Sequence, residues 1–133
     1  MDKMSPHELE WTDAYSVGFD RMDVEHKEIM TLANRVIRAI DLKRSEQEIH
    51  DELDILLGRT CRHFFDEEST MAQTGFLGLS EHRTEHNHLA RMLIRFSVDY
   101  RSGEVSAAQA ADFLKDWLVD HVIKADLDYL PHF

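Results

Sequence analysis

Residues 49–67 read IHDELDILLGRTCRHFFDE, and the side chains on one helical face of this stretch change character along its length. Steps of four and three residues, the spacing of an amphipathic α-helix, connect the members of this face. The face is aliphatic where it begins and polar where it ends: Ile49, Leu53, Leu56, Thr60, His63 and Glu67. The stretch therefore predicts a buried helix that carries polar donors at its C-terminal end.

Three other segments of the chain show the same periodicity. Five glycines and two prolines, placed far apart, favour long helices with short connections. Ser45 begins the capping pattern Ser-Glu-Gln-Glu, and Ser106 begins Ser-Ala-Ala-Gln. The predicted helices cover about residues 20–41, 45–73, 80–102 and 106–129.

Four helices joined by short loops pack most simply as an up-down-up-down antiparallel bundle. We therefore expect an all-α fold in one domain, residues 1–133. Residues 1–19 show no periodicity and predict an extended arm across the bundle. Its apolar side chains are Trp11, Tyr15, Val17 and Phe19.

Composition excludes several classes of protein. The net charge is −11, from 15 basic and 26 acidic residues, so no basic face exists for nucleic acid. No apolar run approaches the roughly 18 residues of a membrane span, and no signal pattern begins the chain, so we expect a cytoplasmic protein without membrane insertion. The single cysteine, Cys61, cannot form an intrachain disulfide or a thiolate cage, and we expect it to be a small packed residue.

The unusual residue is histidine, which occurs nine times. Antiparallel packing puts the end of the second helix, with His63 and Glu67, level with the start of the third, with His82 and His86. Residues four apart on a helix differ by about 40° and about 6 Å, so each pair can reach one centre. The first helix brings His26 to this level. The fourth brings His121.

Burying so many polar groups unpaired costs a few kcal/mol each, so we expect a metal to satisfy them together. Imidazoles and carboxylates without sulfur suit iron, manganese or zinc. The seventh donor is an aspartate of the fourth helix. Asp126 lies about 140° from His121 on a regular α-helix and needs one π turn to align, whereas Asp128 lies about 10 Å along the axis. Seven ligands exceed one tetrahedral zinc and suit two octahedral ions.

The ordered set His26, His63-x-x-x-Glu67, His82-x-x-x-His86 and His121-x-x-x-x-Asp126 resembles the hemerythrin family, in particular its bacterial single-domain members. The similarity extends from Trp11 to Tyr129 and includes Trp117 four residues before His121.

The resemblance implies a non-heme di-iron centre that binds O2 reversibly, for carriage, storage or delivery, in a protein that is not an enzyme. His82, His86 and His121 would hold one iron, and His26 and His63 the other, which keeps an open position. Glu67 and Asp126 would bridge the two irons together with an oxo or hydroxo group. Family-matched positions would form an apolar wall around the ligand: Ile29, Phe64, Trp117, Leu118 and Val122.

Two other functions stay open at this stage. One is an O2 or redox sensor domain that signals to a protein partner, and the other is a di-iron enzyme that consumes peroxide or nitric oxide. The absence of an inward general acid or base beyond the ligands counts against the enzyme. The remaining histidines are expected at the solvated surface: His7, His50, His88 and His132.

Overall fold

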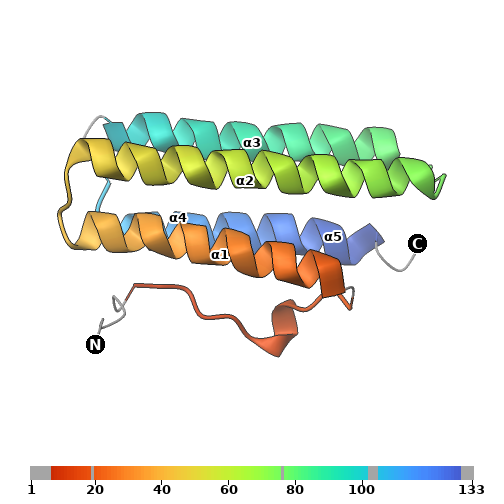
Figure 1. Cartoon of the computed structure of the whole chain (residues 1–133), viewed down its shortest axis with the longest axis horizontal. Helices are drawn as coiled ribbons and strands as arrows, with labels where there is room; N and C mark the ends of the chain where they lie inside the picture. The colour runs from red at the N-terminus through yellow and green to blue at the C-terminus, as the bar shows by residue number, and fades with distance from the viewer. Residues whose placement is uncertain (1–6, 19, 76, 102–104, 130–133) are drawn as a thin grey trace.

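The computed structural model describes residues 7–18, 20–75, 77–101 and 105–129, and within these ranges it contains helices and loops but no strand. The helical rods are α1 (Asp20–Asp41), α2 (Glu46–Gln73), α3 (Leu79–Arg101) and a composite fourth rod. The fourth rod runs through α4 (Ala107–Lys115), the π-helical segment η2 (Asp116–Ile123) and α5 (Lys124–Tyr129). The rods lie side by side with alternating direction (Figure 1), which confirms the predicted all-α antiparallel four-helix bundle.

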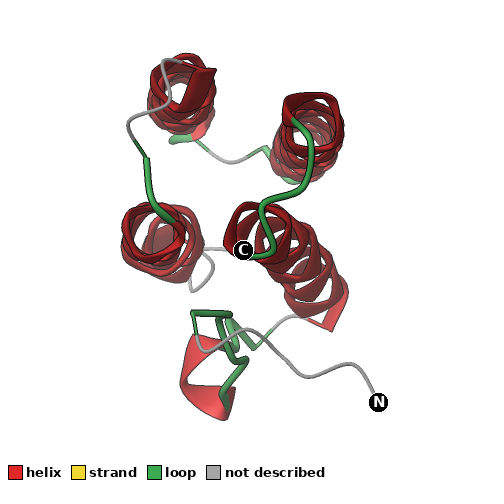
Figure 2. Cartoon of the chain, turned by 90° about the vertical axis from the view of Figure 1, so that its left-hand side faces the viewer, coloured by secondary structure: helices red, strands yellow, loops and turns green. Residues whose placement is uncertain are grey.

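Viewed end-on, the four rods occupy the corners of a square (Figure 2). α1 packs on α2, α2 on α3, α3 on η2 and α4 on α1, which closes the ring around one interior. The C-terminal end of α2 and the N-terminal end of α3 lie together at one end of the bundle (Figure 1). The same end receives the beginning of α1 and α5, so all four rods can contribute side chains to one level.

Local sequence signals account for where these helices begin. The Ser45 hydroxyl accepts a hydrogen bond from the Glu48 amide (3.2 Å). At α4 the capping box is complete, because the Gln109 amide donates to Ser106 Oγ (3.2 Å) and the Ser106 amide donates to Gln109 Oε1 (2.9 Å). After α2, Gly75 adopts φ +69°, a left-handed conformation that glycine adopts without steric cost.

The end of the bundle opposite the histidines holds an aliphatic and aromatic core. Phe96 of α3 and Phe113 of α4 stack with parallel rings 4.5 Å apart. The buried residues of this part include Val36, Ile37, Leu53, Leu56, Leu93, Ala110 and Leu114. The expectation for Cys61 was wrong in one respect: the residue is exposed on α2 rather than packed. It lies on the outer face of the helix, about 200° from His63.

The N-terminal arm packs along α1. The Leu9 backbone exchanges two hydrogen bonds with the Asn34 side chain (2.6 and 2.8 Å), and Glu8 pairs with Arg38 (2.7 Å). Of the predicted apolar residues, Val17 is buried and Trp11 and Tyr15 pack half-buried against the core, whereas Phe19 lies outside the described residues. Within the described ranges, no helix combines the length and apolar character needed to cross a bilayer.

Candidate metal centre

Six of the seven predicted ligands meet in the interior and form two overlapping groups. In each group, one ligand atom per residue lies within 4.8 Å of every other. The first group is His26, His63, Glu67 and Asp126, and the second is Glu67, His82, His86 and Asp126. All six side chains are buried. Because the two carboxylates belong to both groups, the arrangement has the form of two adjacent sites with shared bridging donors.

The Nε2 atoms of the four imidazoles face the shared carboxylates. His26 Nε2 lies 2.6 Å from Asp126 Oδ2, and His63 Nε2 lies 3.4 Å from the same oxygen. His86 Nε2 is 3.0 Å from Glu67 Oε1, and His82 Nε2 contacts that oxygen as well. The distances join donors from three helices at Asp126 and from two helices at Glu67, so neither group depends on one helix alone.

The outward nitrogens of two imidazoles are held by further carboxylates. The Nδ1–H of His63 donates to Glu25 Oε1 (2.8 Å), and the Nδ1–H of His86 donates to Glu68 Oε2 (2.9 Å). Each bond fixes the tautomer whose Nε2 lone pair points into the site. A carboxylate partner also makes the imidazole a stronger electron-pair donor to a metal ion. One histidine of each group is therefore oriented by an acidic residue from a neighbouring helix.

Sequence reasoning did not assign these roles to Glu25 and Glu68. Both are next to a predicted ligand in the chain, Glu25 before His26 and Glu68 after Glu67. Such neighbours project about 100° from the ligand on their own helix, toward the adjacent helix. An acidic residue beside a ligand and level with a histidine of the next helix is the signal that could have identified them.

Electrostatics at the site favour protonated imidazoles opposite ionised carboxylates when no ion is present. Burial opposes the charge of His63, but the neighbouring carboxylates of Asp126, Glu25 and Glu67 outweigh it and raise the pKa to about 10. For His82, burial is likewise outweighed by Asp126 and Glu67, which raise the pKa to about 9. Burial opposes ionisation of Asp126, yet hydrogen bonds with the histidines hold its pKa well below its usual range.

Three buried atoms of the donor residues lack a hydrogen-bond partner, and two of them, His63 Nε2 and Glu67 Oε2, face the centre, whereas the third is His26 Nδ1. The two that face the centre lie 3.5 Å apart and belong to the same group of donors. Unpaired buried polar atoms are costly, and a cation would satisfy both. Imidazole nitrogens and carboxylate oxygens without thiolates are donors suited to iron. The residues present therefore fit a pair of metal ions of this kind.

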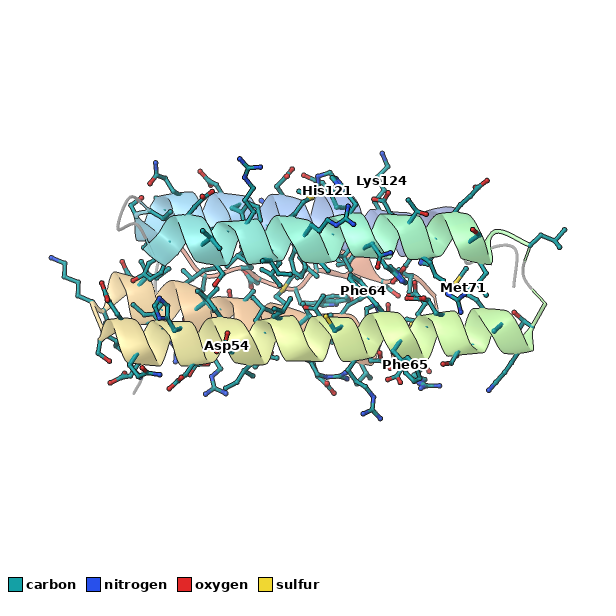
Figure 3. All side chains as sticks on the ribbon, turned by 90° about the horizontal axis from the view of Figure 1, so that it is seen from above. Asp54, Phe64, Phe65, Met71, His121 and Lys124 are labelled. Atoms are coloured by element: carbon teal, nitrogen blue, oxygen red, sulfur yellow. The ribbon has the colours of Figure 1, made fainter. Side chains whose placement is uncertain are left out.

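The structure does not bring His121 into this cluster. Its side chain is 37% exposed and its Nε2 lies 3.4 Å from Asp116 Oδ2. Figure 3 shows it at the outer edge of the bundle beside Lys124, whereas Phe64 lies between the helices. The fourth rod does contain a π-helical segment, as the five-residue step to Asp126 required. Within that segment, however, Trp117, Leu118 and Val122 occupy the inward face.

All five residues of the predicted apolar wall are buried. Phe64 stacks on His86, with ring centroids 4.1 Å apart and an interplanar angle of 8°. The indole N–H of Trp117 donates to the Leu89 carbonyl (2.9 Å), which leaves only its apolar ring surface for packing. The set as a whole is Ile29, Phe64, Trp117, Leu118 and Val122. Phe64 thus places an apolar ring directly against a donor imidazole, and all five residues belong to the hydrophobic core of the bundle.

Known proteins are similar to this chain in sequence and in fold. Residues 17–133 match the family model described as the hemerythrin HHE cation binding domain. A bacteriohemerythrin of Methylococcus capsulatus is 31% identical over 92% of this chain and 95% of the relative. A myohemerythrin of Riftia pachyptila is 28% identical over 93% of this chain and 92% of the relative.

Solved structures agree with these relatives. The crystal structure of a wild-type hemerythrin superposes with a TM-score of 0.76 at 28% identity, and covers 92% of this chain and 95% of that one. The matched family model extends over all six residues of the buried donor cluster. The chain belongs to the hemerythrin family.

Proposed function

We propose that this protein binds O2 reversibly at a non-heme di-iron centre and serves in oxygen carriage, storage or delivery. The observation that carries the proposal is the pair of buried four-residue donor groups that share Glu67 and Asp126. Two ferrous ions would supply one electron each to O2 and recover them on its release. The family of the chain and its curated relatives support the same function.

The chain's own residues divide between the two ions. His26 and His63 would hold one ion, and His82 and His86 would hold the other, while Glu67 and Asp126 belong to both donor groups. Glu25 and Glu68 keep His63 and His86 in the orientation that presents Nε2 to the ions. The side with only two histidines, His26 and His63, would be the side at which O2 binds.

We assign His121 as the seventh ligand, on the His82 and His86 side. Its position five residues before Asp126 matches the family's spacing, and the π-helical segment that contains it is the part of the fourth rod with non-standard hydrogen bonding. π-Helical turns occur frequently at functional sites. Occupation of the centre would then draw His121 away from Asp116 and into the interior.

The apolar wall gives the site the properties of a carrier. Water would stabilise charge separation at the centre and promote loss of electrons, so the buried wall that includes Phe64 and Trp117 protects the reduced state. Among the described residues, the buried ionisable groups of the centre are the donors themselves and Glu25, which is paired with His63, and the buried carboxylate of Glu8 is paired with Arg38. No separate buried acid or base is therefore available for turnover, and binding is the function that this interior supports.

Two finer assignments belong to the same proposal. We place the protein in the cytoplasm, where reductants maintain ferrous iron and a free thiol such as Cys61. A redox protein partner would return any ferric centre to the ferrous state. Fractionation of cells and measurement of iron reduction with a purified reductase test these two points.

Anaerobic reconstitution with ferrous iron, followed by air, tests the function directly. We expect two irons per chain and charge-transfer absorption bands in air that disappear under argon and return with O2. The His82→Ala and Glu67→Ala variants should lack the bands, whereas His88→Ala, which alters an exposed histidine on the same helix as His82, should retain them. One zinc per chain without any response to O2 would contradict the proposal.

A further inference from the structure

Thr60 on α2 is a buried hydroxyl without a partner. Its side chain is 0% exposed, and Oγ1 makes no hydrogen bond. Helical threonines commonly donate to the carbonyl four residues earlier. In this chain Thr31, Thr70 and Thr84 do so, at 3.0 to 3.2 Å. The Thr60 hydroxyl is not used by its own helix in this way and stays free for another partner.

The other polar residues that are buried as whole residues, within the described part of the chain, all take part in the metal centre. They are the six donors and Glu25, each with a polar contact to another member of the set. Thr60 is the exception, since it is equally buried and has no such contact. A buried hydroxyl that is left unpaired destabilises the fold, so a partner that arrives later is the economical explanation.

Helix geometry places Thr60 beside the histidine that faces the open position. It precedes His63 by three residues and Phe64 by four, so all three share one face of α2. Helical side chains lean toward the N-terminus, and the rings of His63 and Phe64 therefore lie over the turn that carries Thr60. Antiparallel packing of α1 on α2, fixed by the contact of Glu25 with His63, puts Ile29 at the same level. Thr60 thus adds one polar group to an apolar wall.

We propose that the Thr60 hydroxyl donates a hydrogen bond to the small exogenous ligand of the di-iron centre. This inference rests on the proposed function. A ligand that takes negative charge from the centre, either O2 or a small anion such as azide, is a hydrogen-bond acceptor in an otherwise apolar pocket. Thr60 then acts as a determinant of ligand affinity and release, without touching the ions.

Thr60→Val removes the hydroxyl at nearly constant shape and is the central variant. We expect the azide affinity of the ferric protein to fall about three- to tenfold. We expect O2 release from the O2-loaded protein to accelerate by a similar factor. Thr60→Ser keeps the hydroxyl and should stay within about twofold of the natural protein. Thr31→Val, which removes an exposed hydroxyl on α1, is the matched control and should leave both values unchanged.

Unfolding of the metal-free protein gives a readout that is independent of ligand binding. Because Oγ1 has no partner, Thr60→Val should unfold at the same urea concentration as the natural chain or at a higher one. A marked loss of stability would assign the hydroxyl a structural role and overturn the inference. Unchanged azide affinity and O2 release in Thr60→Val would also overturn the inference. Tighter binding of these ligands would overturn it too, because it would indicate that the hydroxyl only holds a water. If the natural chain itself binds neither ligand, the proposed function fails instead.

Discussion

Glu25 of α1 and His63 of α2 are joined by a hydrogen bond of 2.8 Å between Oε1 and Nδ1, deep in the bundle. The bond turns the other nitrogen of His63 toward Glu67 and Asp126. Glu25 is in turn approached by the exposed Arg21, whose Nε lies 3.4 Å from Oε2. A chain of polar contacts thus runs from the surface to a donor atom.

Removal of Glu25 should weaken iron binding without removing a ligand. We expect Glu25→Ala to lower iron affinity by about 10- to 100-fold, because His63 loses the partner that fixes its tautomer and orientation. Glu25→Gln, whose amide oxygen can still accept the bond, should fall between this variant and the natural chain. Competition with a chelator measures the affinities. Glu28→Ala serves as the control and should bind iron normally. Glu28 is on the same helix as Glu25, is half-exposed and pairs with Arg59 of α2.

The assignment of His121 as a ligand can be decided by a pair of histidine variants. His121→Ala should lower iron affinity by at least about tenfold, since loss of a direct donor costs no less than loss of an outer partner. His88→Ala provides the comparison, because this histidine is exposed on α3. Asp116→Asn weakens the contact between Asp116 and His121 at the outer edge of the bundle, and we expect this variant to bind iron at least as tightly as the natural chain. Equal iron affinity in the two alanine variants would exclude His121.

The metal-free protein should lose stability as the pH rises from neutral to alkaline. The pKa of His63 is raised to about 10 and that of His82 to about 9, both above the ordinary value of 6.5. Their contribution is therefore complete below about pH 6.5 and disappears as the pH rises through these values. Asp126 has a lowered pKa, so its contribution is present above pH 3.8 and is lost in acid. Urea unfolding at about pH 5.5 and about pH 9.5 should differ by a few kcal/mol.

The iron-loaded protein provides the contrast. Metal binding requires neutral imidazoles, so the alkaline loss of stability should be absent and iron affinity should rise with pH up to about 9 or 10. In acid the order reverses, and protonation of the ligands should release the ions. A metal-free protein that is equally stable at both pH values would show that the buried carboxylates do not protonate His63 and His82.

Phe64 and Phe65 are adjacent in the chain but differ in environment, which allows a matched test of the apolar wall. Phe64 is buried against His86, whereas Phe65 is 66% exposed. Phe64→Ala should destabilise the fold by about 3–5 kcal/mol and admit water, so that the O2-loaded form oxidises faster. Phe65→Ala should change stability by no more than about 0.5 kcal/mol and leave the oxidation rate unaltered. Oxidation at the same rate in both variants would argue against a protective wall.

Most of the fold could be predicted from the helical periodicity and the capping residues of the sequence. Ser45 and Ser106 begin helices as predicted, and steps of three and four residues identified the inward histidines of α2 and α3. These features are local, so they can be read from neighbouring residues. The roles of Glu25 and Glu68 could not be predicted in this way, because each role depends on how closely one helix approaches the next. The side on which His121 lies was equally inaccessible, because it depends on which residues of a π-helical segment fill the interior.

The donors lie toward the end of the bundle where α1 and α3 begin, and a hydrocarbon interior fills the other end. The two ends therefore owe their rigidity to different forces. Without iron, the buried donors have only one another as partners, and His63 Nε2 and Glu67 Oε2 have none. The beginnings of α1 and α3 together with α5 should therefore loosen, and backbone amides there should exchange with deuterium quickly. Amides around Val36, Leu56, Leu93 and Leu114 should remain slow to exchange. Iron binding would then rigidify one half of a molecule that is already folded.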